Sequence, residues 1–357
     1  MVNASTSAMT PSFFAASYSA SRADALIQKM QIGVASAPPA ANTGFILADE
    51  ACGQALIDKV AEWLAAELGG PVLAIPVLGS EGNEAKIQVL IGNVEATSFG
   101  PLNDWSFDAL AEAMRTEHKV GTRLVVMDPR TPFFAQRANW IHEAGEAFLV
   151  GAMGAPSGSY RGPIGMSFGL SAPVISRTLP GVERLSGDFA ITAAEGQVVH
   201  EIDSRPALDV LREVAGDILA RKIEQIPSFL YTAFPVSSAE PQDFLVRRIN
   251  GLGQRSGSFS IEDQVLPGMP ISFARRNGAH VTNTLKLGVR ELLARAGSTP
   301  RAAIFLSDQR REPDFDIPEA GLVAKELGEI PLIHGTINSV ISNNRLYALA
   351  SQLILIL

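Results

Sequence analysis

The stretch VLAIPVLGSEGN, residues 72–83, is an apolar run that ends in a glycine-containing turn. A short apolar run bounded by turn residues is typical of a buried strand. Two later stretches have the same form, FLVGAMGAPSGS at 148–159 and PLIHGTINS at 331–339. The sequence therefore predicts the same kind of strand exit three times.

Each strand exit closes a longer unit that begins with another apolar strand. These opening strands all end in aspartate and are GFILAD (44–49), RLVVMD (123–128) and AIFLSD (303–308). In the first unit, apolar residues recur every four positions from Leu56 to Leu68, which predicts an amphipathic helix that ends at the glycine pair 69–70. Shorter patterns predict helices in the other two units, RANWIHEAGE (137–146) and EAGLVAKELGE (319–329).

The spacing within these units is typical of parallel crossovers. Roughly twenty residues separate Asp49, Asp128 and Asp308 from the next predicted strand, as in a right-handed strand–helix–strand connection. Loops at the carboxyl ends of parallel strands collect ligands. Three similar exits favour duplicated units around a shared pocket. The simpler interpretation is that such units are common and that each aspartate only caps a helix.

Other segments predict antiparallel structure. Residues 186–218 read as strand, turn, strand and helix, and residues 243–276 read as three short strands followed by a helix over 282–296. The apolar tail LYALASQLILIL (346–357) predicts a buried terminal strand. The fold class is therefore α/β, with two domains and mixed β-sheets flanked by helices. Proline and serine concentrate at 224–242, which predicts the domain break there.

Composition limits the function classes. The chain has 357 residues, of which 46% are hydrophobic and 18% charged, as in a globular protein with a core. A formal net charge of −8 argues against nucleic acid and anionic membranes as partners. A single cysteine, Cys52, excludes an internal disulfide, and no apolar run reaches the length of a membrane span. We therefore expect a cytoplasmic location.

The order of three segments resembles the FIST family. DFLVRRINGLGQRSGSFSIEDQVLPGMPISFARR (243–276) is similar to the family's C-domain segment, which has a YLVR-I-G strand. SGDFAITAAEGQVVHEIDSRPALDVLREV (186–214) is similar to its G--F-VT segment, and the region from 303 to 357 to its terminal segment. The resemblance implies a FIST N-terminal-like domain at 22–223 and a C-terminal-like domain at 224–357.

This resemblance also implies a function. Members of the family are regarded as intracellular sensory modules for small ligands, and some bacterial members bind haem and sense nitric oxide beside a histidine kinase. We therefore expect a small-molecule ligand and a signalling protein as partners, with haem as a possible cofactor. The axial haem candidates are His334 and His280.

The sequence departs from the family pattern at its turns. A cysteine-containing turn common in the family reads IPVLGSEGN here, a GCRPIG stretch is replaced by PGVERLSG (180–187), and the last turn reads HGTINSV (334–340) without the GEI motif. The cysteine of the family's FSC-GR motif is replaced at Ser307 and Asp308. These losses motivate an alternative, a degenerate member that acts as a subunit or scaffold in a protein complex.

No catalytic motif favours an enzyme. The sequence has no G-x-S-x-G elbow, no P-loop, and no H-E-x-x-H or H-x-x-E-H metal motif. Cys52 precedes a predicted helix, where a thiolate is favoured, although an inert small residue is the simpler interpretation. We expect neither a catalytic residue nor a metal site.

The predicted ligand pocket is formed by the three strand exits. Backbone N–H groups at glycine turns, together with hydroxyl and amide side chains, suit a small polar ligand. Two arginines, Arg161 and Arg345, are placed to pair with a carboxylate. The full set of predicted ligand-binding residues is Gly79, Ser80, Asn83, Gly151, Gly154, Ser157, Arg161, His334, Gly335, Thr336, Asn338 and Arg345.

Overall fold

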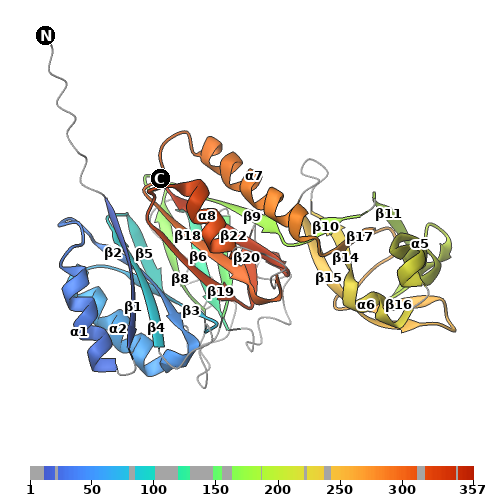
Figure 1. Ribbon diagram of the computed structural model, residues 1–357, viewed down its shortest axis with the longest axis horizontal. Helices are drawn as coiled ribbons and strands as arrows, with labels where there is room; N and C mark the ends of the chain where they lie inside the picture. Colours follow the sequence, from blue (N-terminus) through green and yellow to red (C-terminus); the bar gives the residue numbers. More distant parts are fainter. Residues whose placement is uncertain are drawn as a thin grey trace, which may run out of the picture.

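The computed structural model contains three β-sheets packed around one core and a small β-barrel at one end (Figure 1). The predicted α/β class with mixed sheets and flanking helices is confirmed. None of the helices in the described part of the chain is long and apolar enough to cross a bilayer. The structure describes residues 12–20, 23–79, 85–100, 120–128, 148–154, 163–185, 187–220, 223–236, 243–311, 318–342 and 345–357.

The first sheet has the strand order β1-β4-β2-β3 and two helices on its outer face. Its strands are β1 (Phe13–Ala20), β2 (Thr43–Asp49), β3 (Val72–Val77) and β4 (Ala85–Gly92). The helices are α1 (Ala23–Val34) and α2 (Gly53–Leu68). Helix α2 ends at Gly69 in the left-handed conformation, which glycine adopts without steric penalty, so the predicted helix end is confirmed.

The second sheet has the order β21-β20-β7-β6-β8-β5 and the third the order β19-β18-β22-β9. The strands of the second sheet are β5 (Ala96–Phe99), β6 (Val120–Met127), β7 (Phe148–Met153), β8 (Ile164–Gly169), β20 (Ser339–Ser342) and β21 (Arg345–Tyr347). Those of the third are β9 (Val174–Pro180), β18 (Ala302–Asp308), β19 (Leu332–Ile337) and β22 (Ala350–Ile356), covered by α7 (Gly278–Ala296) and α8 (Glu319–Leu327).

The three sheets share one topology, which confirms the predicted repeat. In each unit the third strand pairs in parallel with the second, the fourth pairs antiparallel with the second, and the first lies beyond the fourth. The helices predicted in the first and third units are α2 and α8. The helix predicted over 137–146 lies outside the described residues.

The repeat holds residue by residue. Asp49, Asp128 and Asp308 occupy the same position at the carboxyl end of the second strand of each unit. Two and four residues earlier, every unit has a buried apolar side chain that faces the common core. These sets are Leu47, Val126 and Leu306, and Phe45, Leu124 and Ile304.

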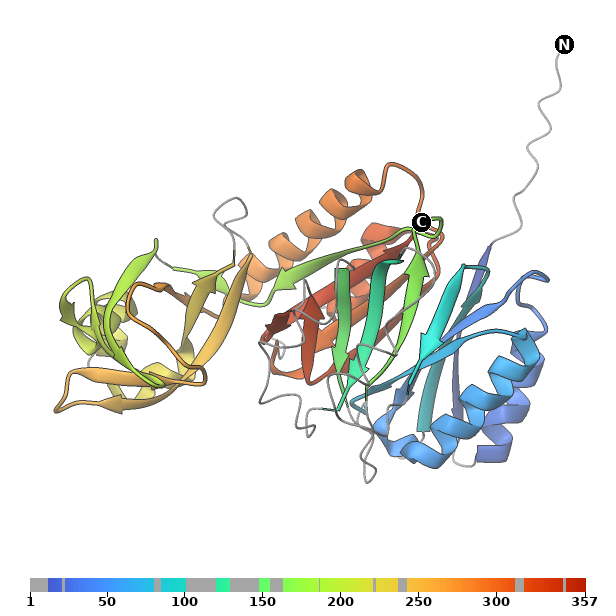
Figure 2. The same ribbon diagram turned by 180° about the vertical axis from the view of Figure 1, so that it is seen from behind.

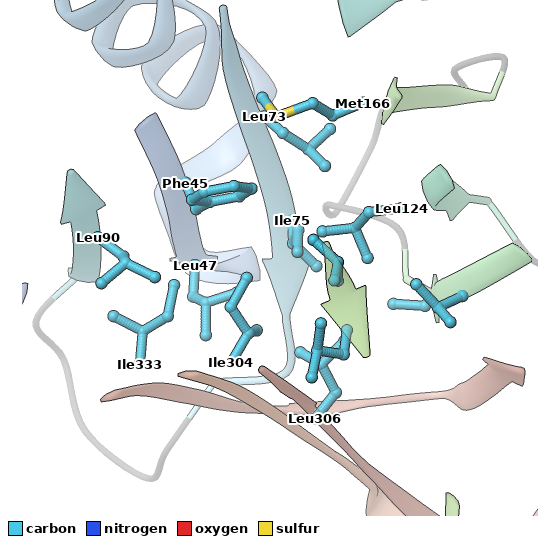
Figure 3. Close-up of a cluster of buried hydrophobic side chains, with 14 of the residues drawn as sticks. Phe45, Leu47, Leu73, Ile75, Leu90, Leu124, Met166, Ile304, Leu306 and Ile333 are labelled. Carbon is cyan, nitrogen blue, oxygen red and sulfur yellow. The ribbon is translucent and has the colours of Figure 1, made fainter. Parts of the chain in front are cut away.

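The inner faces of the three sheets form a single central core. Figure 3 shows Leu47 of β2 beside Ile304 of β18, and Phe45 of β2, Leu306 of β18 and Leu124 of β6 in the same cluster. All five side chains are almost completely buried, so the three units fold as one body rather than as separate domains.

The barrel is inserted into the third unit, between β9 and α7 (Figure 2). Six strands close a ring in the order β14-β15-β16-β12-β11-β17, since β17 also pairs with β14. They are β11 (Phe189–Glu195), β12 (Val198–Ile202), β14 (Leu230–Pro235), β15 (Phe244–Gly253), β16 (Ser258–Ile261) and β17 (Pro270–Arg275). Also present are β10 (Glu183–Arg184), β13 (Arg205–Pro206), α5 (Ala207–Ala220) and α6 (Ile226–Phe229).

The segments predicted to be antiparallel, 186–218 and 243–276, both supply strands to the barrel. The predicted buried terminal strand is β22. The predicted domain break at 224 falls inside the barrel. Leu208 and Leu230, on either side of that position, belong to the same barrel core. The structure therefore divides the chain into a three-sheet body and an inserted barrel, because a domain follows its core rather than a local concentration of proline and serine.

Candidate functional site

The three strand exits meet at one end of the body. The N–H of Leu78, after β3, donates to the carbonyl oxygen of Thr336 in β19 at 2.7 Å. The N–H of Asn338 donates to the carbonyl oxygen of Met153 at the end of β7 at 2.9 Å. Each of these exits therefore pairs with the third strand of a neighbouring unit.

Gly154 completes this contact. A Cβ atom at this position would lie 2.6 Å from the carbonyl oxygen of Pro76, so only glycine allows the exit of the second unit to touch β3. The described parts of the three exits are thus in direct contact. Ser80, Asn83, Ser157 and Arg161, which were predicted to line the pocket, lie outside the described residues.

The remaining predicted residues have separate surroundings. Gly79 lies against the Asp49 carboxylate, and Gly335 packs in the core against Val77. Gly151 lies against the backbone of β6, and Arg345 is on β21. Parallel pairing places Ile337, not Gly335, beside Asp308, as Val77 lies beside Asp49.

The strand-ending aspartates cap the segments that follow them in two units. The N–H of Ala51 donates to Asp49 Oδ1 at 2.9 Å, and the N–H of Arg310 donates to Asp308 Oδ1 at 2.8 Å. Both carboxylates are buried. Each aspartate therefore caps the short 3-10 helix that follows its strand, rather than the longer helix of its unit. Asp308 also accepts the N–H of Leu349 at 3.0 Å and pairs with the guanidinium of Arg310.

Two glutamines join neighbouring sheets. Gln88 of β4 donates from Nε2 to the carbonyl oxygen of His334 at 2.6 Å and accepts the N–H of His334 at Oε1 at 3.2 Å. Gln352 of β22 accepts the N–H of Gly151 in β7 at 3.3 Å. We call each of these contacts, from a fourth strand to the third strand of another unit, a glutamine clasp.

The two clasps are equivalent positions of the repeat. Gln88 is paired with Leu47, and Gln352 with Leu306, which are matching core residues. The corresponding residue of the second unit is Ile164, paired with Val126. The clasp is therefore replaced by an apolar side chain where the second unit meets the first.

A cavity of about 320 Å³ lies at this junction without a clasp. It runs between helix α2 and strand β3 of the first unit and strands β5 and β8 of the second. Apolar walls come from residues such as Leu73 and Ile164. The polar side chains among its described lining residues are Gln54, Asp58, Glu62, Ser98 and Asp128.

Of the residues predicted from sequence to bind ligand, the described lining of this cavity includes only Gly154. The cavity extends away from the meeting point of the exits and along the junction. Asp128 had a sequence signal, since it ends a strand in the same way as Asp49 and Asp308. Gln54 and Ser98 had none, because nothing in their local sequence indicates that α2 faces β5.

The two candidate haem ligands are apart from this cavity. His334 lies on β19 with its backbone held by Gln88, and partial desolvation together with the charge of Lys86 lowers the pKa of its ring. His280 lies in the first turn of α7, where its N–H donates to the Asn277 side chain. Neither histidine is among the described lining residues.

The described residues contain no cluster of three His, Cys, Asp or Glu side chains arranged to hold a metal ion. Cys52 also differs from an activated nucleophile. Burial, with the nearby Asp49 carboxylate, raises the pKa of the Cys52 thiol to about 11. At neutral pH the side chain is therefore the unreactive thiol rather than the thiolate.

This raised pKa predicts slow alkylation of Cys52. At pH 8 the folded protein should react with iodoacetamide about 100-fold more slowly than a free cysteine, because so little thiolate is present. The rate, followed by mass spectrometry, should still be rising at pH 10. Protein unfolded in urea is the control and should react at the ordinary rate. A plateau below pH 9 in the folded protein would contradict the prediction.

The chain is similar to proteins without an assigned function. Uncharacterised proteins of Mycobacterium bovis and Mycobacterium tuberculosis are each 26% identical to it over 194 residues, which is 51% of this chain and 50% of theirs. A second M. tuberculosis protein is 26% identical over 196 residues, 52% of this chain and 50% of its own. The chain thus spans about half the length of the curated relatives it matches. No family model matches it.

Proposed function

We propose that this protein is a non-catalytic, intracellular sensory protein of the FIST type that binds a small ligand in the cavity between its first and second units. The observation that carries the proposal is the position of the cavity. At the position equivalent to Ile164, the first and third units have glutamines, Gln88 and Gln352, that link one sheet to another. At the junction with Ile164 there is instead an open volume of about 320 Å³.

The size and chemistry of the cavity suit a small metabolite. Ligand pockets begin at roughly 300 Å³ and combine apolar walls with a few polar groups that fix orientation. Ile57 and Leu73 supply apolar surface, and Gln54 and Ser98 supply hydrogen-bonding groups. A compound held here would touch both units.

Such a position suits a sensor. A ligand that binds only the folded protein stabilises it by RT ln(1 + [L]/Kd), about 2.7 kcal/mol at one hundred times Kd. Because the ligand would span the junction, part of this free energy would favour one arrangement of the first unit against the second. A signalling partner could respond to that arrangement.

A native purification tests this proposal. Mass spectrometry of the denatured protein should release a small metabolite, and thermal denaturation with that compound should raise Tm by several degrees. The absorption spectrum of the same sample tests haem, because a haem protein has a Soret band. The subunit or scaffold alternative would be favoured instead if the protein always co-purified with another protein, released no metabolite, and gave no thermal shift with a metabolite library.

A further inference from the structure

A second and larger groove lies between the second and third units. Its volume is about 780 Å³, and it is bounded by strand β9, helix α7 and the beginning of β7. Asp243, at the start of barrel strand β15, also lines it. Strand β9 and helix α7 are the two elements that connect the barrel to the body (Figure 1).

Strand β9 presents an edge to this groove. It pairs with β22 alone, and the alternation of that antiparallel pairing turns the backbone groups of Val174, Ser176 and Thr178 away from β22. Two of the outward carbonyls have partners: Thr122 Oγ1 donates to Val174 at 3.1 Å, and Arg295 Nη2 donates to Ser176 at 2.6 Å. The N–H groups of Ser176 and Thr178 and the carbonyl of Thr178 have none among the residues that the structure covers.

Both apolar and charged side chains surround this edge. Phe148 and Leu287 line the groove and are 37% and 57% exposed. Arg177 is paired with Glu291 at 2.5 Å. Arg295 has no carboxylate partner in the described part of the chain, so its guanidinium is a cation available to an acidic group.

We propose that this groove binds an extended peptide segment of a partner protein, which adds a strand to the edge of β9. The N–H groups of Ser176 and Thr178 and the carbonyl of Thr178 lie two residues apart on one edge, which is the spacing that the backbone of an added strand requires. Alternate side chains of the peptide lie against Phe148 and Leu287. An acidic side chain of the peptide pairs with Arg295.

A random octapeptide library displayed on phage tests this proposal on the full-length protein. Selected peptides should alternate apolar residues and carry an aspartate or glutamate. Their synthetic fluorescent forms should bind the wild type in fluorescence anisotropy. Two forms of each peptide, N-methylated on one or on the other alternate set of amides, should differ at least tenfold in affinity, because only one set of amides faces β9 in a β-ladder. Full affinity of both N-methylated forms would overturn the proposal.

Two substitutions locate the binding site. Thr178→Pro removes one outward N–H without removing a hydrogen bond to β22, and should abolish peptide binding, whereas Thr178→Val keeps the N–H and should bind normally. Arg295→Ala should remove the preference for acidic peptides. It provides the test of the binding site if Thr178→Pro does not fold. Failure to enrich any peptide, or equal binding to wild type and to a folded Thr178→Pro variant, would sink the idea.

Discussion

Glu319→Ala should lower the free energy of unfolding by about 3–5 kcal/mol, because it leaves a buried arginine without its counter-charge. Arg311 and Glu319 have side chains only 3% and 9% exposed and are joined at 2.5 Å. Both carboxylate oxygens accept from Arg311 Nε, at 2.9 and 3.0 Å. Ser307 Oγ also donates to Glu319 at 3.0 Å.

The pair also holds distant strands together. Arg311 Nη1 donates to the carbonyl oxygen of Leu179 in β9, so the guanidinium joins the exit of β18 to the strand that leads into the barrel. Loss of Glu319 removes the charge that positions this guanidinium. The expected destabilisation therefore combines an unpaired buried cation with a weakened link between β9 and β18.

Urea denaturation of three variants checks this prediction. Glu326→Ala is the control on the same helix, because its partner Arg290 is 67% exposed and its loss leaves no buried charge unpaired, so it should cost less than Glu319→Ala. The double variant Arg311→Met with Glu319→Leu should regain most of the lost stability, because an apolar pair needs no counter-charge. Equal midpoints for Glu319→Ala and Glu326→Ala would contradict this account of the pair.

The repeat could be predicted from sequence because it rests on local patterns. Apolar runs, glycine turns and strand-ending aspartates define each unit within about fifty residues. The structure has the predicted strand–helix–strand units in the first and third cases, and the two predicted parallel strands in the second. The end of the third unit's parallel strand was misplaced. Gly335 was predicted at a strand exit, but it lies inside β19, which continues to Ile337 beside Asp308. A shift of two residues leaves the inward and outward faces of a strand unchanged, so the pattern alone could not locate this end.

The junctions between units could not be predicted in the same way. Gln88 contacts His334 across 246 positions of sequence, and Gln352 contacts Gly151 across 201. The one signal was a glutamine within each of two apolar strands, KIQVLIG (86–92) and ASQLILI (350–356). A buried polar side chain in such a strand needs a partner, but only the packing of the sheets identifies which one.

The barrel escaped prediction for a related reason. Its strands on both sides of residue 224 were read correctly as antiparallel, but ring closure depends on β14 pairing with both β15 and β17. Local propensity does not specify that second pairing. The domain boundary at 224 was predicted from local composition. Closure of the barrel instead places Leu208 and Leu230, on either side of that boundary, in one core.

Ser98→Trp should abolish ligand binding in the cavity at the junction without a clasp. Ser98 lies on β5, lines the cavity, and is paired with Met166, whose side chain faces the central core. An indole ring at this position occupies the space between β5 and β3. At a ligand concentration one hundred times Kd, the stabilisation of about 2.7 kcal/mol expected for the wild type should be absent in the variant.

Thr97→Trp is the matched control for this variant. Thr97 is the neighbouring residue of β5, it is also exposed, and it points to the opposite face of the sheet because successive strand side chains alternate. It is not among the described residues that line the cavity. The control should keep the full thermal shift and should match Ser98→Trp in far-ultraviolet circular dichroism.

Ile164→Gln tests the same cavity from the other side. By the equivalence of the repeat, a glutamine here should reach the backbone of Ala74 in β3, as Gln88 reaches His334 and Gln352 reaches Gly151. A third clasp would close the junction, raise Tm in the absence of ligand and reduce the ligand-induced shift. If both Ser98→Trp and Ile164→Gln fold and still give the full thermal shift, the ligand binds elsewhere on the protein.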